Sequence, residues 1–443
     1  MQAILQRFAA TGAETAISIT RAVTHHRLGL RLAFDSGVLD VALMSEAVRL
    51  SLDAEPVLGC AFRTDERHAY WERLSDLDER SAFSWREYAD VDTAMIDFQV
   101  GEIPDEGPQV AVALFMGPDR DELGVKVSHV VADGQAAKQY TYLLADIYSR
   151  LAVDASYAPQ PNLVTRPTGR QVWGHLSSEQ RRNARQAKSW AKPVWKVPGK
   201  GSSGGGLTYR TALVEPRRFR ELRAFAGSHD ATINDLMLTA VFRACAARFD
   251  PPTGVPLSLM CTADLRRFLP DRESLPISNV SISGSLDIER VEGESFDQTL
   301  VRVRQRMAVW SKQCYGAAPF MNAERLAGFG YRPTQKLLGL TFRLAGGSGK
   351  TYPWFTNIGV LDESRLAFGE HYPIAGQAYG PSAKGPAIVP VISTYRDALS
   401  ICMGFCRDDM NEAVIDDVLS LTIAELDNAG GVSDKRIEQN AGR

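Results

Sequence analysis

The sequence has few cysteines and places none of them where a metal ion would be bound. Six cysteines occur among 443 residues, without a Cys-x-x-Cys pair. Cys402 and Cys406 are close in the chain, but no histidine lies near them and the segment between them has the pattern of a strand. The cysteines are therefore predicted to be reduced core residues, and no metal site is predicted.

Long apolar runs and an excess of charge are also missing. No apolar run approaches the roughly 18 residues that a membrane-spanning helix needs, and residues 1–23 have neither an apolar signal core nor a cleavage pattern. Lys and Arg total 50 against 53 Asp and Glu, which gives a formal charge of −3. The sequence therefore predicts a cytoplasmic protein that does not span a membrane. It gives no reason to expect nucleic acid or an anionic membrane as a general partner, and it leaves local basic patches open.

Signatures of nucleotide binding and of serine hydrolysis are absent as well. Neither half of the chain has a Gly-rich phosphate loop after a first strand, which disfavours a nucleotide-binding fold. No nucleophile elbow, a Gly-x-Ser-x-Gly between a strand and a helix, is predicted. No short tandem repeat is visible, so a solenoid is not expected either.

The most informative stretch that is present runs from residue 125 to residue 134. Apolar and polar residues alternate up to Ser128, as in a half-buried strand, and a helical pattern follows Gly134. His129 therefore lies in a turn between two rigid elements. Imidazole has an ordinary pKa near 6.5, so at neutral pH it can take a proton from a hydroxyl or amine that attacks a carbonyl. His129 is the predicted general base, within a His-x-x-x-Asp-Gly sequence that ends with Asp133 and Gly134.

Alternating strand and helix patterns predict an α/β protein with layered sheets and helices in two lobes. We expect an N-terminal lobe over residues 1–157, a connection over 158–207 and a C-terminal lobe over 208–443. The connection ends in a Gly and Ser run at 201–206, which favours a flexible linker or a mobile lid. The predicted strands span residues 28–34, 57–63, 70–74, 110–116, 122–128, 209–214, 257–262, 278–286, 354–361, 387–394 and 398–406. The predicted helices span residues 38–52, 135–151, 215–226, 232–248, 296–310, 334–344 and 412–427.

The chain resembles the CoA-dependent acyltransferase superfamily, which includes chloramphenicol acetyltransferase, condensation domains of peptide synthetases and related lipid acyltransferases. The superfamily signature is His-His-x-x-x-Asp-Gly, and in this sequence Ser128 takes the place of the first histidine. The second histidine is the chemical one in the family, so the resemblance implies that His129 is the base. The missing first histidine weakens the likeness to condensation domains more than the likeness to acyltransferases.

Two stretches of the second half support the resemblance. Residues 231–236 resemble a Thr-x-Asn-Asp helix start of related acyltransferases, although their threonine or asparagine would also serve simply as a helix cap. Residues 263–270 resemble a stretch that, in the superfamily, supplies an arginine to the motif aspartate. The resemblance therefore implies a structural role for Asp133, paired with either Arg266 or Arg267, rather than a role in orienting the imidazole.

A third stretch, residues 355–359, resembles the Ser-Asn-x-Gly strand that lies beside the channel between the two halves of these enzymes. Asn357 is a predicted substrate-binding residue on this basis, and Ser128, next to His129, is predicted to bind substrate as well. An alternative for Asn357 stays open, namely that it forms a turn or bulge together with Gly359.

The resemblance implies two similar mixed α/β lobes in a V-shaped pseudo-dimer with a central tunnel, and with both lobes in one chain a monomer is favoured. The substrates implied are an acyl thioester, either acyl-CoA or an acyl chain on the phosphopantetheine arm of an acyl-carrier protein, and an alcohol or amine acceptor from lipid or natural-product biosynthesis. No permanently bound cofactor and no covalent acyl-enzyme are implied. The backbone N–H of Gly134, at a helix start, is the predicted donor to the oxyanion.

Two other functions remain open from the sequence. The first is a condensation enzyme that forms amide bonds between carrier-bound substrates. The second is a non-catalytic module that docks carrier proteins, since the superfamily contains degenerate members. The His129 motif argues against the second, whereas Ser128 argues weakly for it. The acyl group, the acceptor and the choice between O- and N-acylation are not determined.

Overall fold

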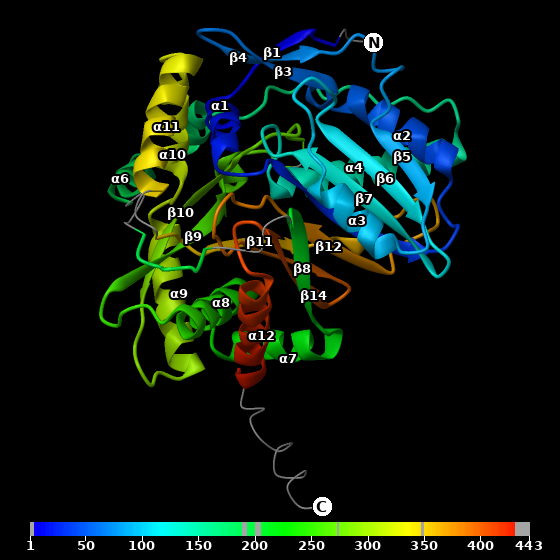
Figure 1. The fold of residues 1–443 in the computed structure, drawn as a ribbon. Coiled ribbons are helices and arrows are strands. Elements are labelled where there is room, and N and C mark those ends of the chain that lie inside the picture. The colour runs from blue at the N-terminus through cyan, green and yellow to red at the C-terminus, as the bar shows by residue number, and fades with distance from the viewer. Residues whose placement is uncertain (1–3, 188–192, 200–204, 273, 347–349, 430–443) are drawn as a thin grey trace, which may run out of the picture.

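The computed structural model describes residues 4–187, 193–199, 205–272, 274–346 and 350–429. Most of the Gly and Ser run at 201–206 lies outside these residues. The described strands form two large mixed sheets and one small antiparallel sheet, with helices packed around them (Figure 1). The α/β class predicted from the sequence is confirmed.

The first large sheet carries the His129 turn. Its strand order is β12-β2-β7-β6-β5, in which β2, β7 and β6 are antiparallel neighbours and β5 runs parallel to β6. These strands are β2 (Arg27–Asp35), β5 (Phe83–Glu87), β6 (Val110–Met116), β7 (Arg120–Ser128) and β12 (Ala375–Tyr379). The helices of this half are α1 (Gly12–Ile19), α2 (Val41–Ala54), α3 (Val91–Val100) and α4 (Gly134–Val153).

The strand before His129 is buried on both faces, not on one as its alternation predicts. Helix α3 covers the second face of β7, and Lys126 lies there with its Nζ donating to the carbonyl oxygens of Phe98 at 2.6 Å and Gly101 at 2.8 Å. A cation that binds the last carbonyls of a helix satisfies acceptors which have no partner within that helix. The polar side chain of Lys126 on the second face therefore contacts helix α3 and does not face solvent.

The second large sheet has the order β10-β9-β11-β13-β14-β8, with parallel pairing at β9–β11 and β11–β13 and antiparallel pairing elsewhere. Its strands are β8 (Leu207–Val214), β9 (Pro256–Asp264), β10 (Ser281–Glu289), β11 (Trp354–Val360), β13 (Pro390–Tyr395) and β14 (Ala398–Cys406). The helices of the second half are α7 (Pro216–Ser228), α8 (Ile233–Phe249), α9 (Phe296–Lys312), α10 (Ala317–Ala327), α11 (Tyr331–Gly346) and α12 (Glu412–Asn428).

Thr232 caps α8 and exchanges hydrogen bonds with Asp235, so the capping role proposed for residues 231–236 is confirmed.

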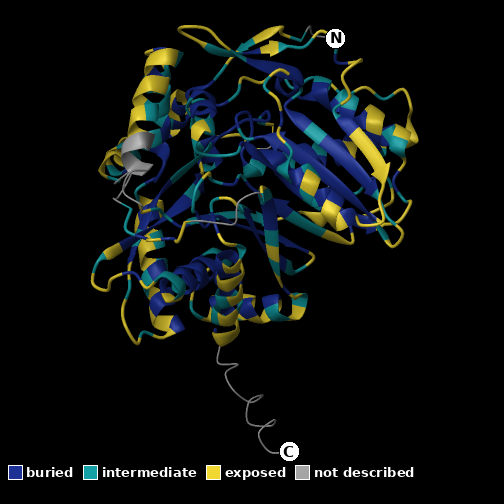
Figure 2. Cartoon of the chain, in the orientation of Figure 1, coloured by how far each residue is buried: buried dark blue, intermediate teal, exposed yellow. Residues whose placement is uncertain are grey.

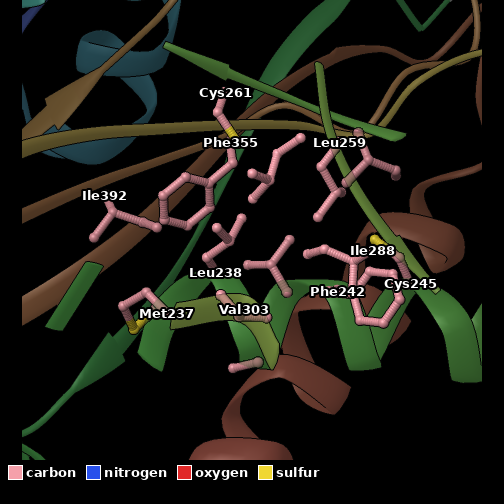
Figure 3. Packing of buried hydrophobic residues seen from close by; sticks show 14 of the residues in the cluster. Met237, Leu238, Phe242, Cys245, Leu259, Cys261, Ile288, Val303, Phe355 and Ile392 are labelled. Atoms are coloured by element: carbon pink, nitrogen blue, oxygen red, sulfur yellow. The ribbon is translucent and has the colours of Figure 1, made fainter. Parts of the chain in front are cut away.

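Each large sheet has its own apolar core. Figure 3 shows part of the core under the second sheet, where Leu238 and Phe242 of α8 lie among Leu259 of β9, Phe355 of β11 and Val303 of α9. Buried residues make up most of the strands in both halves (Figure 2). Burying one such side chain stabilises the fold by about 1.5–3 kcal/mol. The apolar core under each sheet therefore holds the strands, and the loops at their ends, in fixed positions.

One strand crosses between the halves. Residues Ala375–Tyr379 leave the second half and add β12 to the edge of the first sheet, antiparallel to β2. The amide N–H of Ala378 also donates to the Ser393 hydroxyl of β13 at 2.9 Å, which links the two large sheets. The division at residues 157 and 208 stays a prediction, and the two halves share more chain than a simple pair of lobes would.

The structure also contains elements that the sequence pattern does not predict. The segment expected to be a linker contains α5 (Gly169–His175) and α6 (Ser178–Gln186), each begun by a capping box. In the small sheet, β1 (Arg7–Ala9) was not predicted, whereas β3 (Cys60–Thr64) and β4 (Ala69–Arg73) correspond to the strands predicted at 57–63 and 70–74. No helix among the described residues is long and apolar enough to cross a membrane.

Candidate active site

The turn after β7 is built from short hydrogen bonds and apolar anchors. The carbonyl oxygen of Ser128 accepts from the amides of Val131 at 3.2 Å and Ala132 at 3.1 Å, which closes the chain into a tight turn. Val130, Val131 and Ala132 are fully buried in the core of the first half. Because these side chains are fixed, the backbone that presents His129 is held rigidly between β7 and α4.

The His129 ring has one nitrogen occupied and one available. Nδ1 lies 2.8 Å from the carbonyl oxygen of Ala132, which can only accept, so Nδ1 carries the proton and Nε2 carries the lone pair. Nε2 has no hydrogen-bond partner among the described residues, and the residue is partly exposed. Burial lowers the pKa of His129 below its ordinary value, and the contact with Ala132 and the charge of Asp133 only partly oppose this. The ring is therefore neutral at neutral pH and has a basic nitrogen available.

Asp133 points away from the imidazole and binds the second half of the chain. Its Oδ2 accepts from the Arg266 guanidinium at 2.8 Å and from the Val280 amide at 2.8 Å, while Oδ1 caps α4 by accepting from the Ala136 amide at 2.9 Å. The side chains of Asp133 and Arg266 are only 2% and 3% exposed. A carboxylate this deeply buried needs such partners, so its contacts are those of a structural residue that fixes the turn.

The two candidate arginines have different surroundings. Arg266 lies in a short 3-10 turn after β9, donates to Asp133 and also donates to the carbonyl oxygen of Ser278 at 2.8 Å. The guanidinium of Arg267 lies over the ring of Phe268, 4.7 Å from its centroid, and makes no ion pair with Asp133. Of the two alternatives left open by the sequence, the structure selects Arg266.

Asn279 is a further residue of the site that the sequence did not reveal. Its Nδ2 donates to the carbonyl oxygen of His129 at 2.8 Å and to that of Ala132 at 3.3 Å. The second of these carbonyls also holds Nδ1 of His129, so Asn279 and the imidazole share one acceptor. The sequence indicates this role only weakly. Ser278 and Asn279 interrupt the apolar residues just before β10, but nothing near them in the sequence connects them with a turn about 150 residues away.

His26 is a second imidazole beside the first. Its ring is 6.4 Å from that of His129 in an edge-on arrangement, and its carbonyl oxygen accepts from the His129 amide at 3.0 Å. Arg21 donates to Nδ1 at 3.3 Å, and Nε2 lies 2.9 Å from the Thr20 hydroxyl. Burial, and then the neighbouring imidazole of His129 and the charge of Arg21, lower the pKa of His26 to about 2. His26 is therefore a neutral neighbour, and its two nitrogens are already engaged.

The remaining predicted residues lie where α4 meets β11. An added Cβ on Gly134 would be 2.8 Å from Cδ1 of Ile358, so glycine permits the close approach of the helix start to this strand. Asn357 shapes a bulge, because its Oδ1 accepts from the amide of Gly359 at 2.8 Å and Gly359 has a φ of +79°. The bulge interpretation of Asn357 is confirmed. Substrate binding by Asn357 and by the buried Ser128, and the oxyanion role of Gly134, stay predictions.

The bulge in β11 also places a lysine between the halves. Nζ of Lys138, one turn into α4, donates to the carbonyl oxygens of Ile358 at 3.2 Å and Val360 at 3.1 Å. These contacts and the Asp133–Arg266 pair join α4 to two separate elements of the second half. The position of His129 relative to the second sheet is therefore fixed on both sides of the turn.

Two surface hollows of the molecule lie elsewhere. One of about 520 Å³ is lined by residues 291–302, and one of about 550 Å³ lies where β1 and β4 meet α11. Neither is lined by His129. Among the described residues, no three His, Cys, Asp or Glu side chains are grouped so that they could hold a metal ion.

The segment that carries Asn279 is anchored by a buried acid. Glu55 accepts from the Ile277 amide at 3.0 Å and from Nδ2 of Asn162 at 2.9 Å. Burial raises the pKa of Glu55 from 4.5 to about 7, although the hydrogen bonds from Ile277 and Asn162 lower it. The folded protein consequently binds this proton more tightly than the unfolded chain does.

Stability is therefore expected to decrease with rising pH because of Glu55. The contribution of Glu55 to the free energy of unfolding is complete below the unfolded pKa of 4.5 and is lost as pH rises through about 7. Above that pH, Glu55 causes no further change in stability. The contribution amounts to about 3 kcal/mol. Urea unfolding of the wild type and Glu55→Gln at several pH values checks this, since the variant is expected to gain stability relative to the wild type between pH 5 and 8. An unchanged difference between the two proteins across that range would contradict it.

Comparison with known proteins identifies the fold. No family model and no curated protein match the sequence. The first condensation domain of the calcium-dependent antibiotic (CDA) synthetase superposes with a TM-score of 0.70 at 19% identity, covering 97% of this chain and 98% of that one. The TRI3 trichothecene 15-O-acetyltransferase from Fusarium sporotrichioides gives 0.70 at 12% identity, covering 95% and 94%. Polyketide synthase associated protein 5 from Mycobacterium tuberculosis gives 0.62 at 15% identity, covering 95% and 98%. The chain has the fold of condensation domains and of this acetyltransferase, as the resemblance predicts.

Proposed function

We propose that this protein is an acyltransferase that moves an acyl group from a thioester to a hydroxyl or amine, with His129 as the general base. The observation that carries the proposal is the contact of His129 Nδ1 with the Ala132 carbonyl oxygen, which leaves Nε2 unprotonated on a partly exposed ring. Similar solved structures include a condensation domain and an O-acetyltransferase. A neutral, fixed imidazole is the group that this chemistry needs.

In the proposed reaction, Nε2 of His129 takes the proton of the acceptor hydroxyl or amine as its oxygen or nitrogen bonds to the thioester carbonyl carbon. The carbonyl becomes a tetrahedral oxyanion, for which the N–H of Gly134, at the positive end of α4, is our candidate donor. When the carbon–sulfur bond breaks, the protonated Nε2 gives its proton to the departing thiolate. The acyl product and a free thiol leave, and His129 returns to its neutral form.

The substrates enter from opposite faces in this proposal. The two large sheets and their helices form a V, and His129 lies on a tunnel between them. The acyl donor is acyl-CoA or the phosphopantetheine arm of an acyl-carrier protein, since both present the same thioester. Asn357 and Ser128 flank this path as substrate-binding residues. The acceptor is a small-molecule, lipid or natural-product alcohol or amine.

Amide formation between carrier-bound substrates is the second candidate. The superposition with the CDA synthetase condensation domain is as good as that with the acetyltransferase, at 0.70 in both cases. Ser128 favours the acyltransferase, because the histidine that condensation domains of this superfamily carry at this position is missing. The two functions differ in their acceptor and in their dependence on a carrier protein.

Free-thiol release from a panel of acyl-CoAs and acyl-carrier proteins, with alcohols and amines as acceptors, tests the proposal. We expect thiol release that requires an acceptor, and the acceptor that supports it distinguishes ester from amide formation. No release with any donor would overturn the enzymatic function and favour a docking module.

Asn279→Ala is expected to lower kcat by about ten- to a hundredfold with little change in KM, because the Ala132 carbonyl that orients the imidazole loses a second donor. Asn411→Ala is a matched control, since Asn411 caps α12 by accepting from the Ala413 amide and has no contact with the turn. Steady-state kinetics of both variants check this. Equal kcat values in the two variants would show that Asn279 does not position His129.

A further inference from the structure

Helix α11 lies at the edge of the molecule (Figure 1). This helix and the turn before it expose apolar side chains. Phe329, Leu337 and Leu340 are 76%, 51% and 49% exposed. Phe329 is the most exposed aromatic side chain among the described residues. The upper part of this helix is largely exposed in Figure 2. Apolar side chains that project so fully into solvent from one short segment of the chain mark an interaction surface.

The turn that displays Phe329 is fixed by hydrogen bonds. The buried Thr334 hydroxyl donates to the carbonyl oxygen of Leu326 at 2.7 Å and lies 2.8 Å from that of Gly330. The Tyr331 amide donates to the carbonyl oxygen of Arg67 in the turn between β3 and β4, at 3.1 Å. Gly330 has a φ of +105°, which an L residue rarely adopts. Phe329 is therefore held outward by its backbone.

The charged side chains of the segment that contains α11 are all cationic. Between Glu324 and Asp362 the sequence contains no acidic residue, although the whole chain has a net charge of −3. Exposed cations among the described residues of this stretch are Arg325, Arg332, Lys336 and Lys350. Arg332 also pairs with the exposed Glu66 at 3.2 Å, an interaction that solvent weakens.

The spacing on α11 separates the two kinds of side chain into neighbouring strips. Leu337 and Leu340 are three residues apart and share one side of the helix, while Arg332 and Lys336 are four apart and share an adjacent side. A helix with an apolar strip beside a cationic strip is typical of helices that lie in the plane of a membrane interface. We call Phe329, Arg332, Lys336, Leu337 and Leu340 the α11 face.

We propose that the α11 face binds the surface of an anionic lipid bilayer. The three apolar side chains insert among the lipid headgroups and upper acyl chains, and Arg332 and Lys336 contact the phosphates. A lipid surface accepts separate projecting side chains without a shaped groove, and its negative charge complements a segment without acidic residues. This association is peripheral and independent of the proposed acyl transfer.

Co-sedimentation of the full chain with phosphatidylcholine vesicles, with or without phosphatidylglycerol, tests the proposal. We expect at least tenfold tighter binding when phosphatidylglycerol is present, and weaker binding as salt rises. Arg332→Gln/Lys336→Gln is expected to weaken binding by roughly ten- to thirtyfold. Phe329→Ser/Leu337→Ser is expected to reduce binding to the level seen with phosphatidylcholine alone.

Val153→Ser and Arg217→Gln are matched controls, because these residues are 92% and 91% exposed on other helices. Both controls should bind vesicles as the wild type does, and thermal unfolding shows whether all variants are folded. Equal binding to the two kinds of vesicle, or none to either, would overturn the proposal. So would light scattering that shows a dimer abolished by Phe329→Ser/Leu337→Ser, since the face would then bind a second copy of the chain.

Discussion

Replacing His129 with alanine is expected to lower kcat/KM for acyl transfer by about a hundred- to ten-thousandfold, the contribution of a positioned general base. The variant loses the only group in the turn whose nitrogen lone pair has no partner among the described residues. KM for the thioester should change little, because the imidazole acts on the acceptor proton. Thiol release and mass spectrometry of the product, measured for both proteins with the acceptor that supports turnover, check this.

Folding of the His129→Ala variant should be nearly unaffected. The side chain donates one short hydrogen bond, to the Ala132 carbonyl oxygen, and such a bond contributes about 1 kcal/mol. Nδ2 of Asn279 lies 3.4 Å from the same nitrogen and cannot donate to it, because Nδ1 carries the proton. His68→Ala is the matched control, since that side chain is 73% exposed in the β3–β4 turn and should retain full activity. Full activity of a folded His129→Ala variant would show that another group takes the proton.

Breaking the Asp133–Arg266 pair is expected to have the largest effect on stability. Arg266→Met leaves a carboxylate that is only 2% exposed without its cation, and losing one partner of a buried pair costs about 3–5 kcal/mol. Arg267→Met should cost about 1 kcal/mol, because that guanidinium only lies over Phe268. Urea unfolding of both variants checks this difference, and equal losses would contradict the assignment of Arg266.

The double variant Asp133→Asn/Arg266→Met isolates the coupling of the pair. Its loss of stability should be smaller than the sum of the two single losses, because no unpaired charge is left. Some loss should remain, since the amides of Val280 and Ala136 depend on the Asp133 oxygens. Additive losses would show that the two side chains do not interact in the folded protein.

The turn could be predicted from the sequence because its determinants are local. Strand alternation before His129 and the helical pattern after Gly134 belong to adjacent residues, and the structure has β7 ending at Ser128 and α4 beginning at Gly134. The arginine partner of Asp133 lies in the second half of the chain, and only the family resemblance of residues 263–270 narrowed it to two candidates. The choice between Arg266 and Arg267 required the 3-10 turn after β9, which aims one guanidinium at Asp133 and the other at Phe268.

Features that depend on distant parts of the chain could not be predicted. Asn279 reaches the turn only because β9 and β10 bring the second half against it, and Glu55 meets Ile277 across the same boundary. Strand β12 has the sequence Ala-Gly-Gln-Ala-Tyr, which has little intrinsic strand preference, and it forms because the edge of β2 offers it partners. In each case tertiary contact, rather than local pattern, determines the outcome.

The pH dependence of kcat/KM, compared between the wild type and His129→Ala, tests the role of His129 as a base most directly. The wild type should lose activity on acidification with a midpoint below 6.5, because burial lowers the pKa of His129 and only the neutral ring accepts a proton. The residual activity of the variant should lack this acid limb. The same limb in both proteins, or a wild-type midpoint above 6.5, would contradict the assignment of His129 as the base.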